Sequence, residues 1–205
     1  MKKEFIMKRV SGITVGILIT GLALSVSSYQ AGQANQAAAG WTTLFDGKSL
    51  TAFTPVGDAN WQVMDGVVQA NKGTGFLVSK ASYGDFQLKV EFWVDDDANS
   101  GVFIRCQDPK QINAMNAYEV NIYDKRPDPA YRTGAIVDVA KPLSMINAGG
   151  KWNTFEITAQ RSHLTVIMNG TKTVDVEHMG HARGPIALQY GAGTVKFRNV
   201  QIKTM

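Results

Sequence analysis

The segment FQLKVEFWV, residues 86–94, decides the fold class of this 205-residue chain. Apolar side chains occupy every second position, and Gln87, Lys89, Glu91 and Trp93 fill the positions between them. A period of two is typical of a β-strand that has one face in a core and the other toward solvent. The segment therefore predicts a long strand, with Trp93 on the face opposite to the core.

The same alternation recurs later in the chain, in residues 154–159, 164–168 and 195–202. Asn169-Gly170 separates two such segments, and this dipeptide is the strongest short signal for a β-hairpin turn. No stretch of ten or more residues has the pattern of a helix. Short strands separated by turn signals predict an all-β protein, a sandwich or jelly roll.

The first 39 residues have a different composition from the rest. Four basic residues precede position 10, residues 10–26 carry no charge, and residues 27–39 are small or polar. This is the order of a secretory signal peptide. The uncharged run has 17 residues, and a membrane span needs about 20, so a cleaved signal is favoured over an anchor. We expect residues 1–39 to be signal and linker, and residues 40–205 to be exported to the periplasm or the medium.

The charge distribution narrows the class of ligand. The formal net charge is +4, but residues 40–205 hold 17 basic and 16 acidic side chains. A nearly neutral domain fits an uncharged ligand better than nucleic acid, and no membrane contact is expected once the leader is removed. The single cysteine, Cys106, excludes an internal disulfide and a cysteine zinc site.

The segment YEVNIYD, residues 118–124, carries the most informative polar side chains. Strand alternation sends Glu119, Asn121 and Tyr123 to one face. An acid, an amide and a phenol in a row suit sugar hydroxyls. The irregular stretches 108–117 and 125–133 flank this strand, and we expect them to form the walls of a cleft over this face. Binding sites tend to lie in such clefts. A solvated sheet face is the alternative.

Arg105 ends a neighbouring apolar strand, in phase with Phe103. We expect its guanidinium either to bind substrate oxygens or to pair with a carboxylate such as Glu119, and a buried ion pair remains equally open. The nearby Asp95-x-Asp97-x-Asn99 pattern resembles a calcium loop, but Cys106 stands where the bidentate glutamate belongs, so a surface turn is expected. The four tryptophans are candidates for sugar stacking, and Trp93 is the best placed of them.

From about Trp41 to Met205 the chain resembles domain of unknown function 1080, the 3-keto-disaccharide hydrolase or 3-keto-glucoside-1,2-lyase/hydratase domain. The resemblance implies a concanavalin-like jelly-roll sandwich of two curved antiparallel sheets. Its pieces, in order along the chain, are Leu44–Leu50, Asn99-Ser100-Gly101 with Arg105, Tyr118-Glu119 with Asp124, Thr133–Ile136, Trp152-Asn153, Asn169-Gly170, Gly184–Gln189 and Phe197–Val200.

The resemblance also implies an activity on glycosides that are oxidised at C3. The ketone acidifies the C2 proton, so a base removes it, the C1 substituent leaves by β-elimination, and hydration completes a net hydrolysis. We assign Glu119 as base or substrate anchor and Arg105 as the cation near the C3 oxygen. The expected substrate-binding residues are Asn121, Tyr123, Asp124, Gln189, Trp93 and Asn99.

Three alternatives stay open at this stage. A divalent metal would serve in place of Arg105 as electrophile, whereas no organic cofactor is expected. Many relatives have Gln at the position of Asn121, and Asp-His-Gly where this chain has Tyr190-Gly191. If that histidine transfers protons in the relatives, this chain lacks it. The protein is then either an enzyme for a small saccharide or a non-catalytic, lectin-like glycan-binding module.

Overall fold

The computed structural model describes Met1 and residues 40–205, which form two antiparallel β-sheets. The predicted signal peptide lies outside the described residues. Within the described part, no helix is long and apolar enough to cross a membrane. The elements are β1 Thr42–Phe45, β2 Phe53–Gly57, β3 Gln62–Met64, β4 Val67–Ala70, β5 Gly75–Ser79, β6 Phe86–Val94, β7 Ser100–Ile104, β8 Tyr118–Ile122, η1 Pro129–Tyr131, β9 Trp152–Gln160, β10 His163–Met168, β11 Thr171–Glu177, β12 Ala187–Tyr190 and β13 Val195–Thr204.

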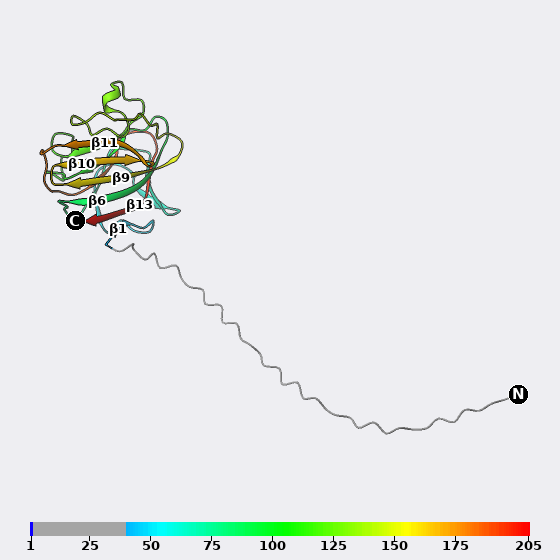
Figure 1. Cartoon of the computed structure of the whole chain (residues 1–205). Coiled ribbons are helices and arrows are strands. Elements are labelled where there is room, and N and C mark those ends of the chain that lie inside the picture. Colours follow the sequence, from blue (N-terminus) through cyan, green and yellow to red (C-terminus); the bar gives the residue numbers. More distant parts are fainter. Residues whose placement is uncertain (2–39) are drawn as a thin grey trace. The chain divides into compact units, whose positions relative to one another are not determined.

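Strand β6 lies inside the larger sheet, as its alternation predicts. This eight-stranded sheet has the order β11-β10-β9-β6-β13-β4-β3, with β1 also paired to β13 (Figure 1). All five apolar residues of β6 are buried, and the four residues between them are partly exposed. The strand therefore presents one face to the core and the other to solvent.

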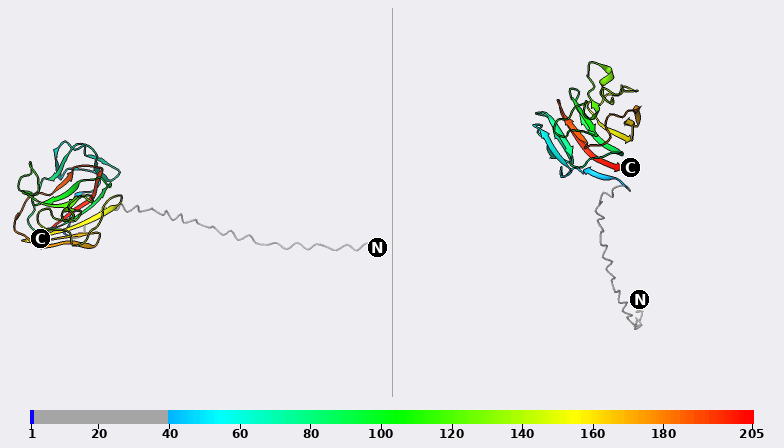
Figure 2. Two further views of the ribbon diagram at one scale, coloured as in Figure 1. Left: turned by 90° about the horizontal axis from the view of Figure 1, so that it is seen from above. Right: turned by 90° about the vertical axis from the view of Figure 1, so that its left-hand side faces the viewer.

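The smaller sheet has the order β2-β5-β12-β7-β8 and stacks on the larger one (Figure 2). Val90 and Phe92 of the larger sheet share one buried cluster with Val102 and Val120 of the smaller sheet. Since apolar side chains from both sheets meet between them, the molecule is a β-sandwich. The prediction of an all-β protein with two antiparallel sheets is confirmed.

The predicted hairpin at Asn169-Gly170 is also confirmed. It joins β10 to β11, and both turn residues have positive φ, 51° at Asn169 and 81° at Gly170. Positive φ at both central positions defines a type I′ turn, which Asn-Gly adopts at low cost. The Asn169 Oδ1 atom accepts a hydrogen bond from the Thr154 amide at 2.8 Å, so the turn is also tied to β9.

The outer face of the smaller sheet is only partly open. The chain between β7 and β8 folds across it, and Ile112 packs on a buried cluster that includes Phe103 and Ala187. The free edge of β8 is covered by residues 134–137, because the amides of Asn121 and Val137 bond across this edge at 3.0 Å each. An edge strand covered in this way does not pair with another molecule.

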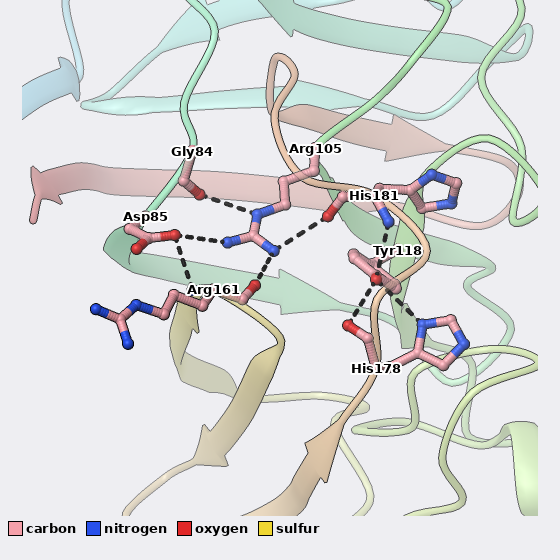
Figure 3. A network of polar contacts seen from close by, with 7 residues as sticks. All are labelled: Gly84, Asp85, Arg105, Tyr118, Arg161, His178 and His181. Atoms are coloured by element: carbon pink, nitrogen blue, oxygen red, sulfur yellow. Dashed lines mark hydrogen bonds and ion pairs between the residues drawn. The ribbon is translucent and has the colours of Figure 1, made fainter.

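A buried arginine joins several loops at one end of the sandwich (Figure 3). Arg105 is 1% exposed. Its guanidinium donates to the carbonyl oxygens of Gly84 at 2.9 Å, Arg161 at 2.7 Å and His181 at 3.1 Å, and to the Asp85 carboxylate at 3.1 Å. The contacts come from three segments, the turn at Gly84-Asp85 and the loops at Arg161 and His181, so a single side chain holds these segments together.

We expect Arg105→Met to destabilise the protein by about 3–5 kcal/mol, because it leaves a carboxylate and three carbonyl groups without their donor. Urea unfolding measures this difference. Lys125→Met is the matched control, since it removes an ion pair to Asp97 whose side chains are 60% and 82% exposed. The control should leave the free energy of unfolding nearly unchanged, because exposed ion pairs contribute little to stability. Equal effects of the two substitutions would contradict the structural role of Arg105.

Candidate functional site

Glu119 projects from β8 onto the outer face of the smaller sheet, where it pairs in register with Phe103. Both neighbours along the strand, Tyr118 and Val120, are buried in the core between the sheets, so alternation places the carboxyl group on the opposite side. Burial raises the pKa of Glu119 to about 7. A carboxyl group with this pKa exchanges a proton near neutral pH, as a general base must.

Two charged side chains of the loop after β8, Arg126 and Asp138, act on this carboxyl group, and Tyr131 is linked to both of them. Arg126 lowers the pKa of Glu119, whereas Asp138 raises it. Tyr131 hydrogen-bonds to Asp138, which raises the pKa of the phenol and keeps it protonated. Arg126 lies 5.8 Å from the centre of the Tyr131 ring. Sequence reasoning missed these three residues because an irregular loop has no periodicity that reports where its side chains point.

Two amide oxygens on the same face lack a hydrogen-bond donor. Asn121 is completely buried; its Nδ2 donates to the Tyr131 carbonyl, but its Oδ1 has no partner. The Oε1 of Gln189 is likewise buried without a partner. Gly101 lies between them: it pairs with Asn121, and a Cβ placed on it would lie 3.4 Å from the Gln189 oxygen. Buried acceptors without donors are costly. Of the two residues only Gln189 is partly exposed, so Gln189 is the candidate for contact with ligand hydroxyl groups.

Gln189 also lines a surface depression of about 540 Å³, together with Asn99, Phe76 and Ile112. Asn99 bonds to the β12–β13 turn through its backbone, accepting from Gly191 and Ala192 at 2.9 and 3.1 Å. Its side chain therefore borders the depression. The structure thus brings together Gln189 and Asn99 from the set of predicted site residues, and places Asn121 on β8, two strands from β12 in the same sheet.

Arg105 does not join this face, contrary to the expected pairing with Glu119. Its φ of +54° is in the left-handed region, which breaks the alternation after Ile104. The guanidinium therefore turns toward the loops around Asp85 and away from the position in phase with Phe103. Its ion pair is with Asp85, which is the buried ion-pair alternative, with a different partner from the one expected.

Asp124 and Tyr123 follow the end of β8 and have structural contacts. The carboxylate of Asp124 accepts from the Thr133 hydroxyl at 2.5 Å and from the amides of Ala148 and Gly149 at 2.7 and 2.9 Å. Protein donors thus occupy the oxygens that were expected to bind sugar hydroxyls. The amide of Tyr123 donates to Thr133 at 2.9 Å, and its ring lies 5.9 Å from Arg126. Because β8 ends at Ile122, Tyr123 belongs to the loop that follows, where its ring lies near Arg126.

Trp93 lies on the other sheet. It is partly exposed, as expected, but it sits on the outer face of the eight-stranded sheet beside Trp152 and Lys196. The two outer faces point away from each other, since the core lies between the sheets. Trp93 therefore cannot contact a ligand that is held by Glu119. Alternation predicted the face of this residue correctly, but it carries no information on which sheet the strand joins.

The residues around Asp95 form a turn, as expected. The Asp95 carboxylate accepts from the amides of Asp97 at 3.2 Å and Thr194 at 2.7 Å. Among the described residues, His, Cys, Asp and Glu side chains nowhere gather in a group of three or more that could hold a metal ion. The metal alternative remains a prediction.

The raised pKa of Glu119 predicts a specific pH dependence of stability. The folded state favours the protonated carboxyl group, so its contribution is complete below the usual pKa of 4.5 and is lost as the pH rises through about 7. Glu119→Gln removes the titrating carboxyl group and with it this pH-dependent contribution to stability. We expect the wild type to lose about 1–3 kcal/mol relative to the variant between pH 4.5 and 8, measured by urea unfolding at both pH values. A difference that does not change with pH would show that the carboxyl group is not buried in solution.

Comparison with solved structures places the fold among carbohydrate-related proteins. A provisionally assigned glycosyl hydrolase from Parabacteroides distasonis superposes with a TM-score of 0.73 at 23% identity, over 81% of this chain and 94% of that one. A second provisionally assigned hydrolase from the same organism gives 0.68 at 26% identity, over 80% and 99%. The carbohydrate-binding module CBM66 from Bacillus subtilis gives 0.58 at 18% identity, over 80% and 96%.

These similarities confirm the expected concanavalin-like jelly-roll sandwich. No protein of curated function matches the chain. The family comparison is more specific, because one family model covers residues 40–203, nearly the whole described part. The chain therefore belongs to the family of 3-keto-alpha-glucoside-1,2-lyase-like domains.

Proposed function

We propose that the protein cleaves the glycosidic bond of 3-keto-glycosides, with Glu119 as the general base. The observation that supports this most directly is the position of a partly buried carboxyl group, with a pKa of about 7, on the sheet face that also holds two unpartnered amide oxygens. Membership of the family supplies the class of reaction. The expected signal peptide leads us to propose further that the enzyme acts outside the cytoplasm.

The proposed reaction has two balanced stages. First, the Glu119 carboxylate takes the C2 proton, the electron pair of the C–H bond forms the enolate of the C3 ketone, and collapse of the enolate forms the C1–C2 double bond while the C1–O bond breaks. The aglycone takes a proton from solvent as it leaves, and Glu119 keeps the proton from C2. In the second stage water adds its oxygen to C1 and releases a proton to solvent, while Glu119 returns its proton to C2, so the net change is hydrolysis and the base is regenerated. The base must be ionised for the first proton transfer.

Arg126 is the cation that we assign to the enolate. Its charge acts on Glu119 directly, whereas the donors of Arg105 are used by Asp85 and three carbonyl groups. A positive charge at this position stabilises the oxygen on which negative charge develops during proton removal.

The amide of Gln189 is assigned to the sugar hydroxyl groups, because this residue lines the depression beside β12 and a hydroxyl group is the donor that a saccharide offers. Asn121 is completely buried, so its unpartnered oxygen is not open to a ligand. Asn99 extends the polar surface at the edge of the depression beside β12.

A lectin-like module is the alternative function, because unpartnered acceptors also suit a protein that binds sugars without cleaving them. Incubation of the purified protein with a 3-keto-disaccharide, followed by the release of reducing sugar, distinguishes the two. Turnover supports the enzyme. Saturable binding of the disaccharide without turnover, with or without added divalent metal, supports the module.

Glu119→Gln should lower kcat by about 10²- to 10⁴-fold, the usual contribution of a general base. The matched control is Glu156→Gln, the same substitution on the outer face of the larger sheet, where Glu156 pairs with Lys89 and is 47% exposed. The control should keep full activity. A fully active Glu119→Gln protein would refute the assignment of the base.

The pH dependence of kcat/KM should report the Glu119 pKa. We expect activity to rise with pH through about 7 and then level off, because only the carboxylate accepts the proton. Arg126→Gln should move this midpoint to higher pH, since Arg126 lowers the pKa, and Asp138→Asn should move it to lower pH. Shifts in the same direction, or none, would contradict the proposed surroundings of the base.

A further inference from the structure

The outer face of the larger sheet carries an ordered row of polar and aromatic side chains. Gln62 pairs with Gln69, Gln69 with Lys196, Lys196 with Trp93, and Trp93 with Trp152. The row thus crosses the five neighbouring strands β3, β4, β13, β6 and β9 in direct register. At the usual strand spacing it is about 19 Å long.

The row is accessible to a ligand from solvent. Gln62 is exposed, and the other four side chains are partly exposed. The Lys196 Nζ atom lies 4.7 Å from the centre of the Trp93 ring, and the Arg198 guanidinium lies 3.9 Å from that of Trp152. Contacts of this type are weak where they are open to water, so a ligand that stacks on the rings can replace them.

Charges on this face largely compensate each other. Arg198 pairs with Glu91 at 2.7 Å, and Lys89 pairs with Glu156 at 3.3 Å. Lys196 is the one cation of the row, and the structure shows no ion pair for it among the described residues. A face of this kind does not favour a polyanion, because sustained binding of phosphates or sulfates depends on several free cations.

We propose that this row is a second, non-catalytic binding surface for an extended chain of neutral sugars. Two tryptophan rings on adjacent strands offer flat apolar surfaces to the C–H faces of sugar rings. The amides of Gln62 and Gln69 each offer donors and an acceptor to hydroxyl groups. The length of the row matches a chain of several sugar residues lying across the strands. The surface is on the opposite side of the sandwich from Glu119, so it holds a glycan without occupying the proposed reaction site.

Calorimetric titration of the purified protein with maltohexaose, cellohexaose and heparin tests the inference. Saturable binding of a hexaose is expected, with Kd increased about tenfold in Trp93→Ala and in Trp152→Ala. Gln62→Ala, a substitution of an exposed residue, should weaken binding by a smaller factor. Circular dichroism checks that each variant is folded. If a tryptophan variant does not fold, Gln62→Ala still tests the row, because Gln62 is exposed and its substitution should not disturb the fold.

Two matched variants separate this surface from its surroundings. Trp41→Ala removes a tryptophan that also lies against a lysine, Lys89 at 5.3 Å, but stands outside the row; its Kd should be unchanged. Glu119→Gln should bind the hexaose with the Kd of the wild type, because Glu119 lies on the opposite side of the sandwich. The binding test therefore stays valid even if the proposed reaction is refuted. The inference is overturned if neither hexaose binds saturably, if heparin alone binds, or if the three substitutions in the row leave Kd unchanged.

Discussion

The pairing of β6 with both β9 and β13 is the interaction on which the rest of the sandwich depends. Strands β6 and β9 pair over eight consecutive positions, and β6 also pairs with β13 along most of its length. A shift of one residue in either pairing would exchange buried and exposed faces. Because Phe92 and its apolar neighbours must face the core, the register is determined. The same register aligns Trp93 with Trp152 on the outer face, so core packing also builds the proposed glycan surface.

Burial has opposite consequences for Arg105 and Glu119, the two ionisable residues that the sequence analysis assigned to catalysis. Arg105 is surrounded by acceptors from three segments, so its charge is compensated and it stabilises the arrangement of loops. For Glu119 the effect of burial outweighs the charge of Arg126, which Asp138 also opposes, and its pKa rises to about 7. A carboxyl group held in this way costs stability at neutral pH and gains the basicity that proton removal needs. Compensation by neighbours, rather than burial itself, separates a structural charge from a reactive one.

The face around Glu119 is assembled from segments that are distant in sequence. Asn121 comes from β8, Gln189 from β12 and Asn99 from the turn before β7, whereas Arg126 and Asp138 come from the loop that follows β8. Asp124 shows the reverse case. It lies in the same family pattern as Glu119, yet its carboxylate is occupied by the amides of Ala148 and Gly149. A residue of the family pattern therefore belongs to the candidate site only where its polar atoms remain unpartnered.

The sequence by itself determined the all-β class, the faces of the long strands and the Asn169-Gly170 hairpin. Each of these follows from a local rule, either the period of two along a strand or the positive φ that Asn and Gly tolerate. Only the tertiary structure decided that Trp93 and Glu119 lie on opposite faces of the sandwich, that Arg105 pairs with Asp85, and that Arg126 and Asp138 act on the pKa of Glu119. These facts depend on which strands become neighbours and how irregular loops fold over them, and packing between distant segments sets both.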